Sequence, residues 1–236
     1  STISKILQKI LKVNIDKQII VVDDFSSDGS RVKILKMKSK IDKIIFHKKN
    51  LGKGAAIRSA QKFVKGKYVI IQDADLEYNP GEYKQLLKAF KNNKTKIVYG
   101  SRVLGRKRYK SKNFLSLARI FFNHLLTIFS NIINNQKLTD AHTCYKVLDS
   151  NIFKKINLVE NKFGFCPEIT TKLSNLRYNI IEIPISYKGR SYKDGKKIRV
   201  VDGLDAIKSL IKYRFFSKYW FKINLKICKK KIKLSF

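Results

Sequence analysis

The sequence predicts an α/β fold in which helices flank a mostly parallel central sheet. Short apolar runs alternate with segments of helical periodicity, and the runs cover residues 17–23, 42–47, 68–71 and 96–101. The runs lack polar alternation, which is typical of strands buried on both faces of a parallel sheet. Charged residues close three of these runs. The carboxyl ends of the strands should therefore form one polar rim, where open α/β sheets bind their ligands.

Three acids at alternate positions follow the run of residues 68–71. Asp73, Asp75 and Glu77 stand in the segment KYVIIQDADLE. An oxygen-rich cluster of this kind suits a hard divalent cation such as Mg²⁺ or Mn²⁺. The simpler alternative is a polar strand end that caps the next helix, and this would be favoured for a lone aspartate. The repetition of the acids favours a metal site.

Two other strand ends bring charge to the same rim. Asp23 and Asp24 close the first run, and Arg102 follows the run KIVYGS. An anionic nucleotide and its metal ion could bridge these groups, because the carboxyl ends of parallel strands meet at one edge of a sheet.

A loop rich in glycine and lysine precedes the third predicted helix. In the stretch HKKNLGKG, the helix is preceded directly by Gly52, Lys53 and Gly54. Backbone amides and a lysine charge at a helix N-terminus suit a phosphate group. On its own, such a triplet is more often a plain helix-starting turn.

Composition gives weaker information about partners. The 236 residues include 52 Lys and Arg against 17 Asp and Glu, a net charge of +35. Such a charge attracts nucleic acid, acidic membrane surfaces or phosphorylated substrates. Lysines are spread along the whole chain, as in proteins of AT-rich genomes, so charge alone does not indicate one partner. Three widely spaced cysteines indicate reduced thiols in a cytosolic compartment.

Basic and apolar segments alternate in the second half. The loop GRKRYKSK, at 105–112, is either a phosphate or membrane contact or a solvated surface loop. Residues 114–133 predict a long apolar helix with polar interruptions, which packs on the domain or lies in a membrane interface. A later loop sets basic residues among glycines, which suits an anion: Arg190, Lys196 and Lys197. We expect one domain over residues 1–212 and a basic aromatic tail of interfacial type over 213–236.

Seven motifs in this order resemble the family-2 glycosyltransferases of GT-A fold. They are VVDDFSSDGS, NLGKGAAI, YVIIQDADLEYNP, VYGSR, TDAHTCYKV, GFCPEIT and PISYKGRSYKDGKKI. The chain looks most like the dolichyl- or polyprenyl-phosphate mannose and glucose synthases. The resemblance implies inverting, metal-dependent transfer of a hexose from GDP-mannose or UDP-glucose to a polyprenyl or dolichyl phosphate, at the cytoplasmic face of a membrane to which the protein binds peripherally.

The resemblance also implies roles for the rim residues. Asp23 and Asp24 match positions beside the base and ribose of the donor, and the GKG triplet lies on the same side. The segment Asp73–Ala74–Asp75 matches the DxD motif that holds Mg²⁺ or Mn²⁺ on the diphosphate, and Glu77 can complete the coordination. Positions near the donor and acceptor phosphates are matched by Arg102 and by the basic loop with Arg190, Lys196 and Lys197. Asp140 matches a position near the acceptor.

One part of the pattern is missing. The family opens with a strand and a PxYNE-like loop, and STISKILQKI matches the residues that follow that loop. We therefore expect a sheet that lacks its first strand, in an N-terminally truncated chain.

Other functions remain open at this stage. A saccharide hydroxyl in envelope polysaccharide or glycolipid synthesis could be the acceptor, and a carboxylate, with Asp140 as the candidate, would then take up the proton. An inactive truncated relative and a basic nucleic-acid-binding protein are alternatives of another class. Only the charge supports nucleic-acid binding, because the sequence shows no stacking platform or recognition helix.

Overall fold

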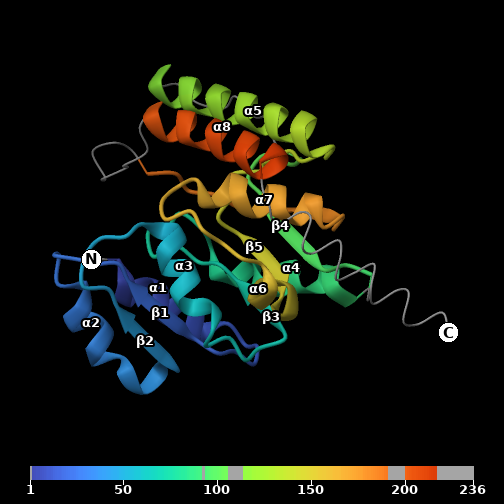
Figure 1. Cartoon of the computed structure of the whole chain (residues 1–236). Helices are drawn as coiled ribbons and strands as arrows, with labels where there is room; N and C mark the ends of the chain where they lie inside the picture. The colour runs from blue at the N-terminus through green and yellow to red at the C-terminus, as the bar shows by residue number, and fades with distance from the viewer. Residues whose placement is uncertain (1, 92–93, 106–113, 191–199, 217–236) are drawn as a thin grey trace.

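The computed structural model describes residues 2–91, 94–105, 114–190 and 200–216. Its described strands form two separate sheets with helices packed around them, which confirms the predicted α/β class (Figure 1). Of the predicted site residues, Lys196 and Lys197 lie outside the described residues, as does the tail from residue 217 onward.

The N-terminal part builds the smaller sheet. Helix α1 (Ile3–Lys12) leads into β1 (Ile20–Asp23), which pairs in parallel with β2 (Lys43–Phe46). Between the strands lie α2 (Ser30–Lys36) and a 3-10 turn, η1 (Lys38–Lys40). Four buried residues join these elements in a small core of their own: Leu7, Ile19, Val21 and Ile34. The helix α3 (Lys53–Gln61) follows and packs against β1.

The larger sheet has the strand order β3–β5–β4–β6, with bounds Tyr68–Ile70, Lys146–Asp149, Ile97–Ser101 and Ile180–Pro184. Strand β5 is antiparallel to both of its neighbours, and β4 pairs in parallel with β6. Three of the four strands therefore share one direction, as predicted for a mostly parallel sheet. The sequence had not predicted a strand where β5 lies.

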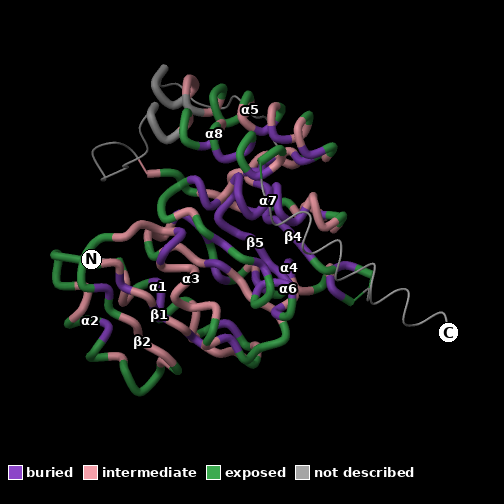
Figure 2. Tube along the Cα trace, viewed as in Figure 1, coloured by how far each residue is buried: buried purple, intermediate pink, exposed green. Residues whose placement is uncertain are grey.

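The central strands of the larger sheet carry the main core. Every residue of β4 is buried, and Tyr99, Val147 and Leu148 have no exposed surface at all. Figure 2 shows this buried centre as purple stretches along β4, β5 and α7. An apolar run without alternation thus marks a strand that is covered on both faces.

Helices cover the sheet and extend to one end of the molecule. The helices α4 (Tyr83–Lys88) and α6 (Ser150–Lys155) and the 3-10 turns η2 (Pro80–Glu82) and η3 (Ala89–Lys91) connect the strands. The helix α7 (Phe165–Asn175) packs against α8 (Val200–Phe215), and α5 (Phe114–Asn134) lies along α8 (Figure 1). None of the helices in the described part of the chain has the length and apolar character needed to cross a membrane.

The two sheets do not join. Strand β1 pairs only with β2, and β3 pairs only with β5, among the strands of the described residues. All three residues of β3 are only partly buried, as an edge strand would be. This break agrees with the prediction of a sheet that lacks one strand.

Candidate active site

The acidic corner forms directly after β3. Asp73 accepts a hydrogen bond from Lys53, with 2.6 Å between Nζ and Oδ2, and Lys53 is the first residue of α3. Leu76, between the second and third acids, has a φ of 64°, in the left-handed region. A residue other than glycine pays about 1 kcal/mol or more for this conformation, and such residues cluster at functional sites. The corner is thus a tightly shaped turn and not a simple strand end.

The other two acids are bound by the segment after β6. Arg190 donates to Asp75, with 2.9 Å between Nη2 and Oδ2, and its backbone N–H donates to Glu77 Oε1 at 2.9 Å. The Tyr187 hydroxyl donates to the other oxygen of Glu77 at 2.8 Å. Arg190 therefore lies at the acidic corner, and its predicted role near the donor and acceptor phosphates stays a prediction.

The corner contains more negative than positive charge. Burial and the nearby charge of Asp73 raise the pKa of Asp75, and Arg190 offsets this only in part. Burial opposes ionisation of Asp73 as well, but Lys53 outweighs it and holds the pKa of that carboxyl below its usual value. Three carboxylates face two cations, so a further positive charge would be stabilised here. In this electrostatic sense the residues fit a divalent cation.

The geometry of a three-ligand metal site is not assembled. Among the described residues, no three His, Cys, Asp or Glu side chains gather in an arrangement that could hold a metal ion. Both oxygens of Glu77 accept hydrogen bonds, from Tyr187 and Arg190, and both oxygens of Asp75 do so too, from Arg190 and the backbone N–H of Glu77, so a metal ion would have to displace these donors. The metal role of the three acids stays a prediction.

The two acids after β1 hold protein groups. Asp23 accepts a hydrogen bond from Arg31 Nε at 2.7 Å. Asp24 accepts from the backbone N–H groups of Leu51 and Gly52, at 2.8 and 2.6 Å, and lies 2.7 Å from His47 Nδ1. Burial opposes ionisation of Asp24, but these hydrogen bonds outweigh it and lower its pKa. Asp24 therefore fixes the loop that presents Lys53. Its predicted contact with the nucleoside remains untested.

The glycines of the GKG triplet are explained by close packing. A Cβ at Gly52 would lie 2.5 Å from the carbonyl oxygen of Asn161, and one at Gly54 would overlap the carbonyl oxygen of Glu160. The backbone N–H of Ala55 also donates to Asn161, at 3.1 Å. Part of the α3 N-terminus thus binds the neighbouring loop. Because the glycines of the triplet pack against this loop, Lys53 is the member of the triplet best suited to the predicted contact with a phosphate.

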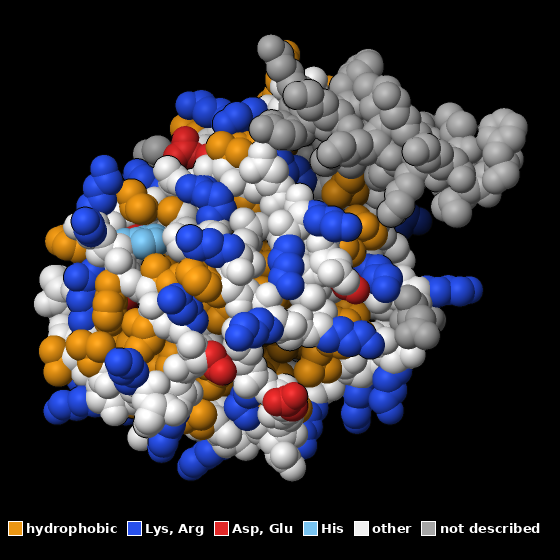
Figure 3. All heavy atoms as spheres, turned by 60° about the horizontal axis from the view of Figure 1, so that its bottom comes forward, with side chains coloured by type: hydrophobic (Ala, Val, Ile, Leu, Met, Phe, Trp, Pro, Cys, Tyr) orange, Lys and Arg blue, Asp and Glu red, His pale blue; other side chains and the backbone are white. Residues whose placement is uncertain are grey.

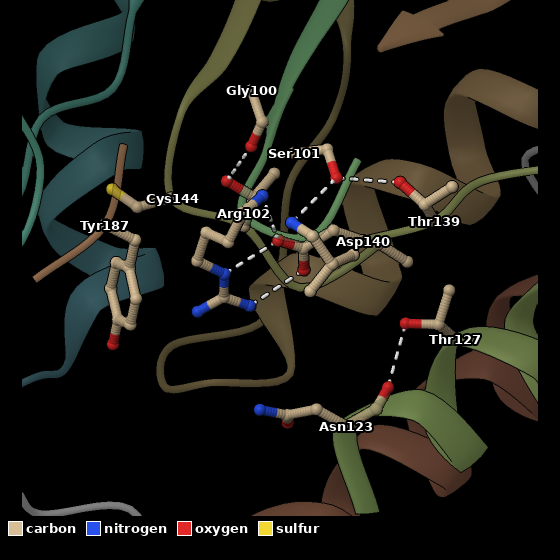
Figure 4. Close-up of polar contacts among 12 residues, drawn as sticks. Gly100, Ser101, Arg102, Asn123, Thr127, Thr139, Asp140, Cys144 and Tyr187 are labelled. Atoms are coloured by element: carbon tan, nitrogen blue, oxygen red, sulfur yellow. Dashed lines mark hydrogen bonds and ion pairs between the residues drawn. The ribbon is translucent and has the colours of Figure 1, made fainter. Parts of the chain in front are cut away.

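Arg102 and Asp140 form a buried, two-pronged ion pair. The guanidinium Nε and Nη2 lie 2.7 and 2.8 Å from the two carboxylate oxygens, and the backbone N–H of Arg102 donates to Oδ2 at 3.0 Å (Figure 4). Burial opposes ionisation of Asp140, but Arg102 outweighs it and lowers the pKa of the carboxyl. Both oxygens are therefore engaged, and an ionised carboxylate in this state is a poor proton acceptor.

Tyr187 connects the acidic corner with this ion pair. Its hydroxyl binds Glu77, and the Arg102 guanidinium lies 5.1 Å from the centre of its ring (Figure 4). The structure thus brings four predicted site residues to the two sides of one tyrosine: Asp75, Glu77, Arg102 and Asp140. Ala74 lies between the acids, and its carbonyl oxygen accepts a hydrogen bond from Thr2.

Sequence reasoning missed several residues that support this rim. Glu182 of β6 accepts hydrogen bonds from the backbone N–H groups of Thr139 and Asp140, at 2.7 and 2.8 Å. A single acid inside the run IIEIPI was the available signal. Fully buried Lys146 donates to the carbonyl oxygens of Ala141 and Thr143, at 3.0 and 2.7 Å. No sequence pattern distinguishes such a lysine from a solvated one.

The fold and this rim define an α/β protein with carboxylates and guanidinium groups gathered at the ends of its strands. The profile described as Glycosyl transferase family 2 matches residues 1–156, and the chain belongs to that family. Two dolichyl-phosphate beta-glucosyltransferases of Trichomonas vaginalis are 25% and 24% identical to it, over 85% of this chain in each case. The chain spans 62% and 64% of the lengths of these two relatives.

Two other proteins are similar to this chain, one in sequence and one in fold. A low-salt glycan biosynthesis hexosyltransferase of Haloferax volcanii is 25% identical over 72% of this chain and 40% of its own length. Glucosyl-3-phosphoglycerate synthase of Mycobacterium tuberculosis, crystallised with Mn²⁺, uridine diphosphate and phosphoglyceric acid, superposes with a TM-score of 0.67. The match covers 91% of this chain and 74% of that one at 12% identity, so it shows a common fold, of GT-A type, and no more.

Proposed function

We propose that this chain transfers a hexose, with inversion, from UDP-glucose or GDP-mannose to a polyprenyl or dolichyl phosphate at the cytoplasmic face of a membrane. One observation carries the proposal: an acidic corner and a partly buried arginine lie on the two sides of Tyr187. The family and the dolichyl-phosphate glucosyltransferases among the relatives support it.

On the donor side, cationic side chains of this protein stabilise the negative charge of the diphosphate. Negative charge builds on the leaving diphosphate as the anomeric bond breaks, and fixed cations stabilise it. Lys53 and Arg190 already lie at this corner. A Mg²⁺ or Mn²⁺ ion, held by Asp73 and Asp75, would supply Lewis-acid and templating chemistry when bound. Burial disfavours the charged form of Lys53, but the neighbouring charge of Asp73 outweighs it, and the pKa of Lys53 lies well above its usual value.

On the acceptor side, the state of Asp140 favours a phosphate over a hydroxyl. A phosphate monoester has a second pKa of about 6 and is ionised at neutral pH, so it attacks without a strong general base. Asp140 cannot easily act as that base while Arg102 holds both of its oxygens. In this proposal Asp140 positions Arg102, and Arg102 attracts the acceptor phosphate.

The binding of nucleic acid has less support. On the face shown in Figure 3, Lys and Arg side chains are scattered among apolar and uncharged groups and do not form a continuous stripe. A nucleic-acid footprint is expected to gather basic residues on one face or along one helix.

The test is a transfer reaction with the full chain. Labelled UDP-glucose or GDP-mannose, Mn²⁺ and polyprenyl phosphate should give a labelled product that extracts into organic solvent. Asp75→Asn should abolish the product, whereas Asp16→Asn, at an exposed position away from the rim, should not. Product found only with a saccharide acceptor would overturn the lipid-phosphate assignment. Absence of transfer to either acceptor, with both donors, would favour an inactive relative.

A further inference from the structure

Helix α5 buries polar side chains. Thr127, Ser130 and Asn134 have 3%, 1% and 2% of their surface exposed, and they share one face of the helix. Asn134 Nδ2 donates to the hydroxyls of Ser130 and of Thr171 in α7, both at 3.2 Å. Thr127 donates to the carbonyl oxygen of Asn123 one turn earlier (Figure 4). The inward face of α5 is thus held by hydrogen bonds.

The opposite face of α5 is apolar and exposed. Its row at helical spacing consists of Phe121, Leu125, Ile128 and Ile132, which are 48%, 45%, 42% and 74% exposed. Phe122 beside them is 58% exposed. A surface helix of a protein in water normally shows the reverse pattern, with its apolar stripe toward the core. Contiguous exposed apolar surface of this kind marks an interaction site.

Helix α8 extends the same character. Leu204, Ile211 and Phe215 are 55%, 37% and 68% exposed and follow one another at helical spacing, with exposed Lys208 and Lys212 on the same helix. The helices α5 and α8 pack side by side at one end of the molecule, and Figure 2 shows exposed stretches along both. We call the exposed apolar rows of the two helices the α5–α8 surface.

The charges around the α5–α8 surface select its partner. The 21 residues of α5 contain no Asp or Glu, and the chain as a whole carries a charge of +35. A second copy would bring a like charge of the same size against this surface, which opposes association. An anionic lipid surface offers apolar depth for the exposed rows and negative charge for Lys208 and the net positive charge of the chain, whereas Lys212 already pairs with Glu160 at 2.9 Å.

We propose that the α5–α8 surface lies on an anionic lipid membrane, with its apolar rows inserted among the acyl chains near the headgroups. This proposal rests on the proposed function for the location at a membrane. It adds which surface of the protein makes the contact. The binding test below uses vesicles without sugar donor or polyprenyl phosphate. Its failure is therefore distinguishable from a failure of sugar transfer.

The experiment is co-sedimentation of the full chain with vesicles, either of phosphatidylcholine alone or of phosphatidylcholine with phosphatidylglycerol. The variant replaces Phe121, Ile128 and Ile132 with Ser. The matched control replaces Val32 and Leu35 of α2, which are 57% and 53% exposed, with Ser. Because all five positions are exposed, both variants should keep the circular dichroism spectrum and the melting temperature of the parent chain.

We expect the parent chain and the α2 control to bind the anionic vesicles equally. The α5 variant should bind at least about tenfold more weakly, because it loses three apolar side chains from the inserted surface. Equal binding by the α5 variant would overturn the proposal. Equal binding to neutral and anionic vesicles would overturn the choice of an anionic surface. A dimer in light scattering that only the α5 variant dissolves, with vesicle binding unchanged, would assign the surface to a second copy.

Discussion

Removing the carboxylate of Asp140 should destabilise the protein through Arg102. The Asp140 side chain is 5% exposed and that of Arg102 18%, and three hydrogen bonds of 2.7 to 3.0 Å join the two residues. Breaking a buried ion pair by removing one partner costs about 3–5 kcal/mol, because the other charge stays buried without a partner. We expect Asp140→Leu to lower the free energy of unfolding by about 3 kcal/mol, at the low end because water still reaches Arg102.

A double-mutant cycle separates the pair from its surroundings. Arg102→Met, Asp140→Leu and the combined variant are unfolded with urea at pH 7. Because the combined variant leaves no unpaired charge, it should be more stable than the sum of the single losses predicts, by about 2 kcal/mol. A loss below about 1 kcal/mol in Asp140→Leu, or a coupling free energy within the usual additivity error of about 0.5 kcal/mol, would refute the reasoning.

Three other predictions follow from the same contacts. Folding lowers the pKa values of Asp23, Asp24 and Asp140. Their contribution to the free energy of unfolding is therefore complete above the unfolded pKa of about 3.9 and is lost as the pH falls through the folded pKa values. Urea unfolding at pH 6 and at pH 3 should show this loss, and an equal free energy of unfolding at the two pH values would contradict it. Gly54→Ala should cost about 3 kcal/mol because of its overlap with the neighbouring backbone, whereas Gly203→Ala in α8, with no atom within 4 Å of its Cβ, should be neutral or stabilising in thermal melts. Lys53→Met should weaken donor binding at least about tenfold without changing the fold, as titration calorimetry and circular dichroism would test together.

The fold followed from the sequence where the hydrophobic pattern was strong. Residues Ile97–Ser101 of the run KIVYGS form a fully buried strand, and the first two runs of the chain pair in parallel, as predicted. Strand β5 was missed because its pattern is broken by Lys146, whose ammonium group is fully buried and bound by two carbonyl oxygens. Such burial depends on loops that fold back over the side chain, and local sequence carries no sign of it.

The candidate site was predictable in its members and less so in their partners. The acids after β3 and Arg102 lie at strand ends, where position alone places them on the rim. The sequence did not show that Asp140 would bind Arg102 or that Asp24 would bind the N–H groups before α3, because these pairs are set by side-chain directions across the sheet. Tyr187 joins the two sides of the site from a segment more than 80 residues away in the chain from Arg102.

The binding of the sugar donor gives the sharpest test of the proposed donor site. Titration calorimetry of the full chain with UDP-glucose and with GDP-mannose, with and without Mn²⁺, measures the donor site before any choice of acceptor. We expect one of the two donors to bind only in the presence of Mn²⁺, and we expect Asp75→Asn to abolish this binding while Asp16→Asn leaves it unchanged. Donor binding that is equally strong in the Asp75→Asn variant, or no binding of either donor to the parent chain, would contradict the account.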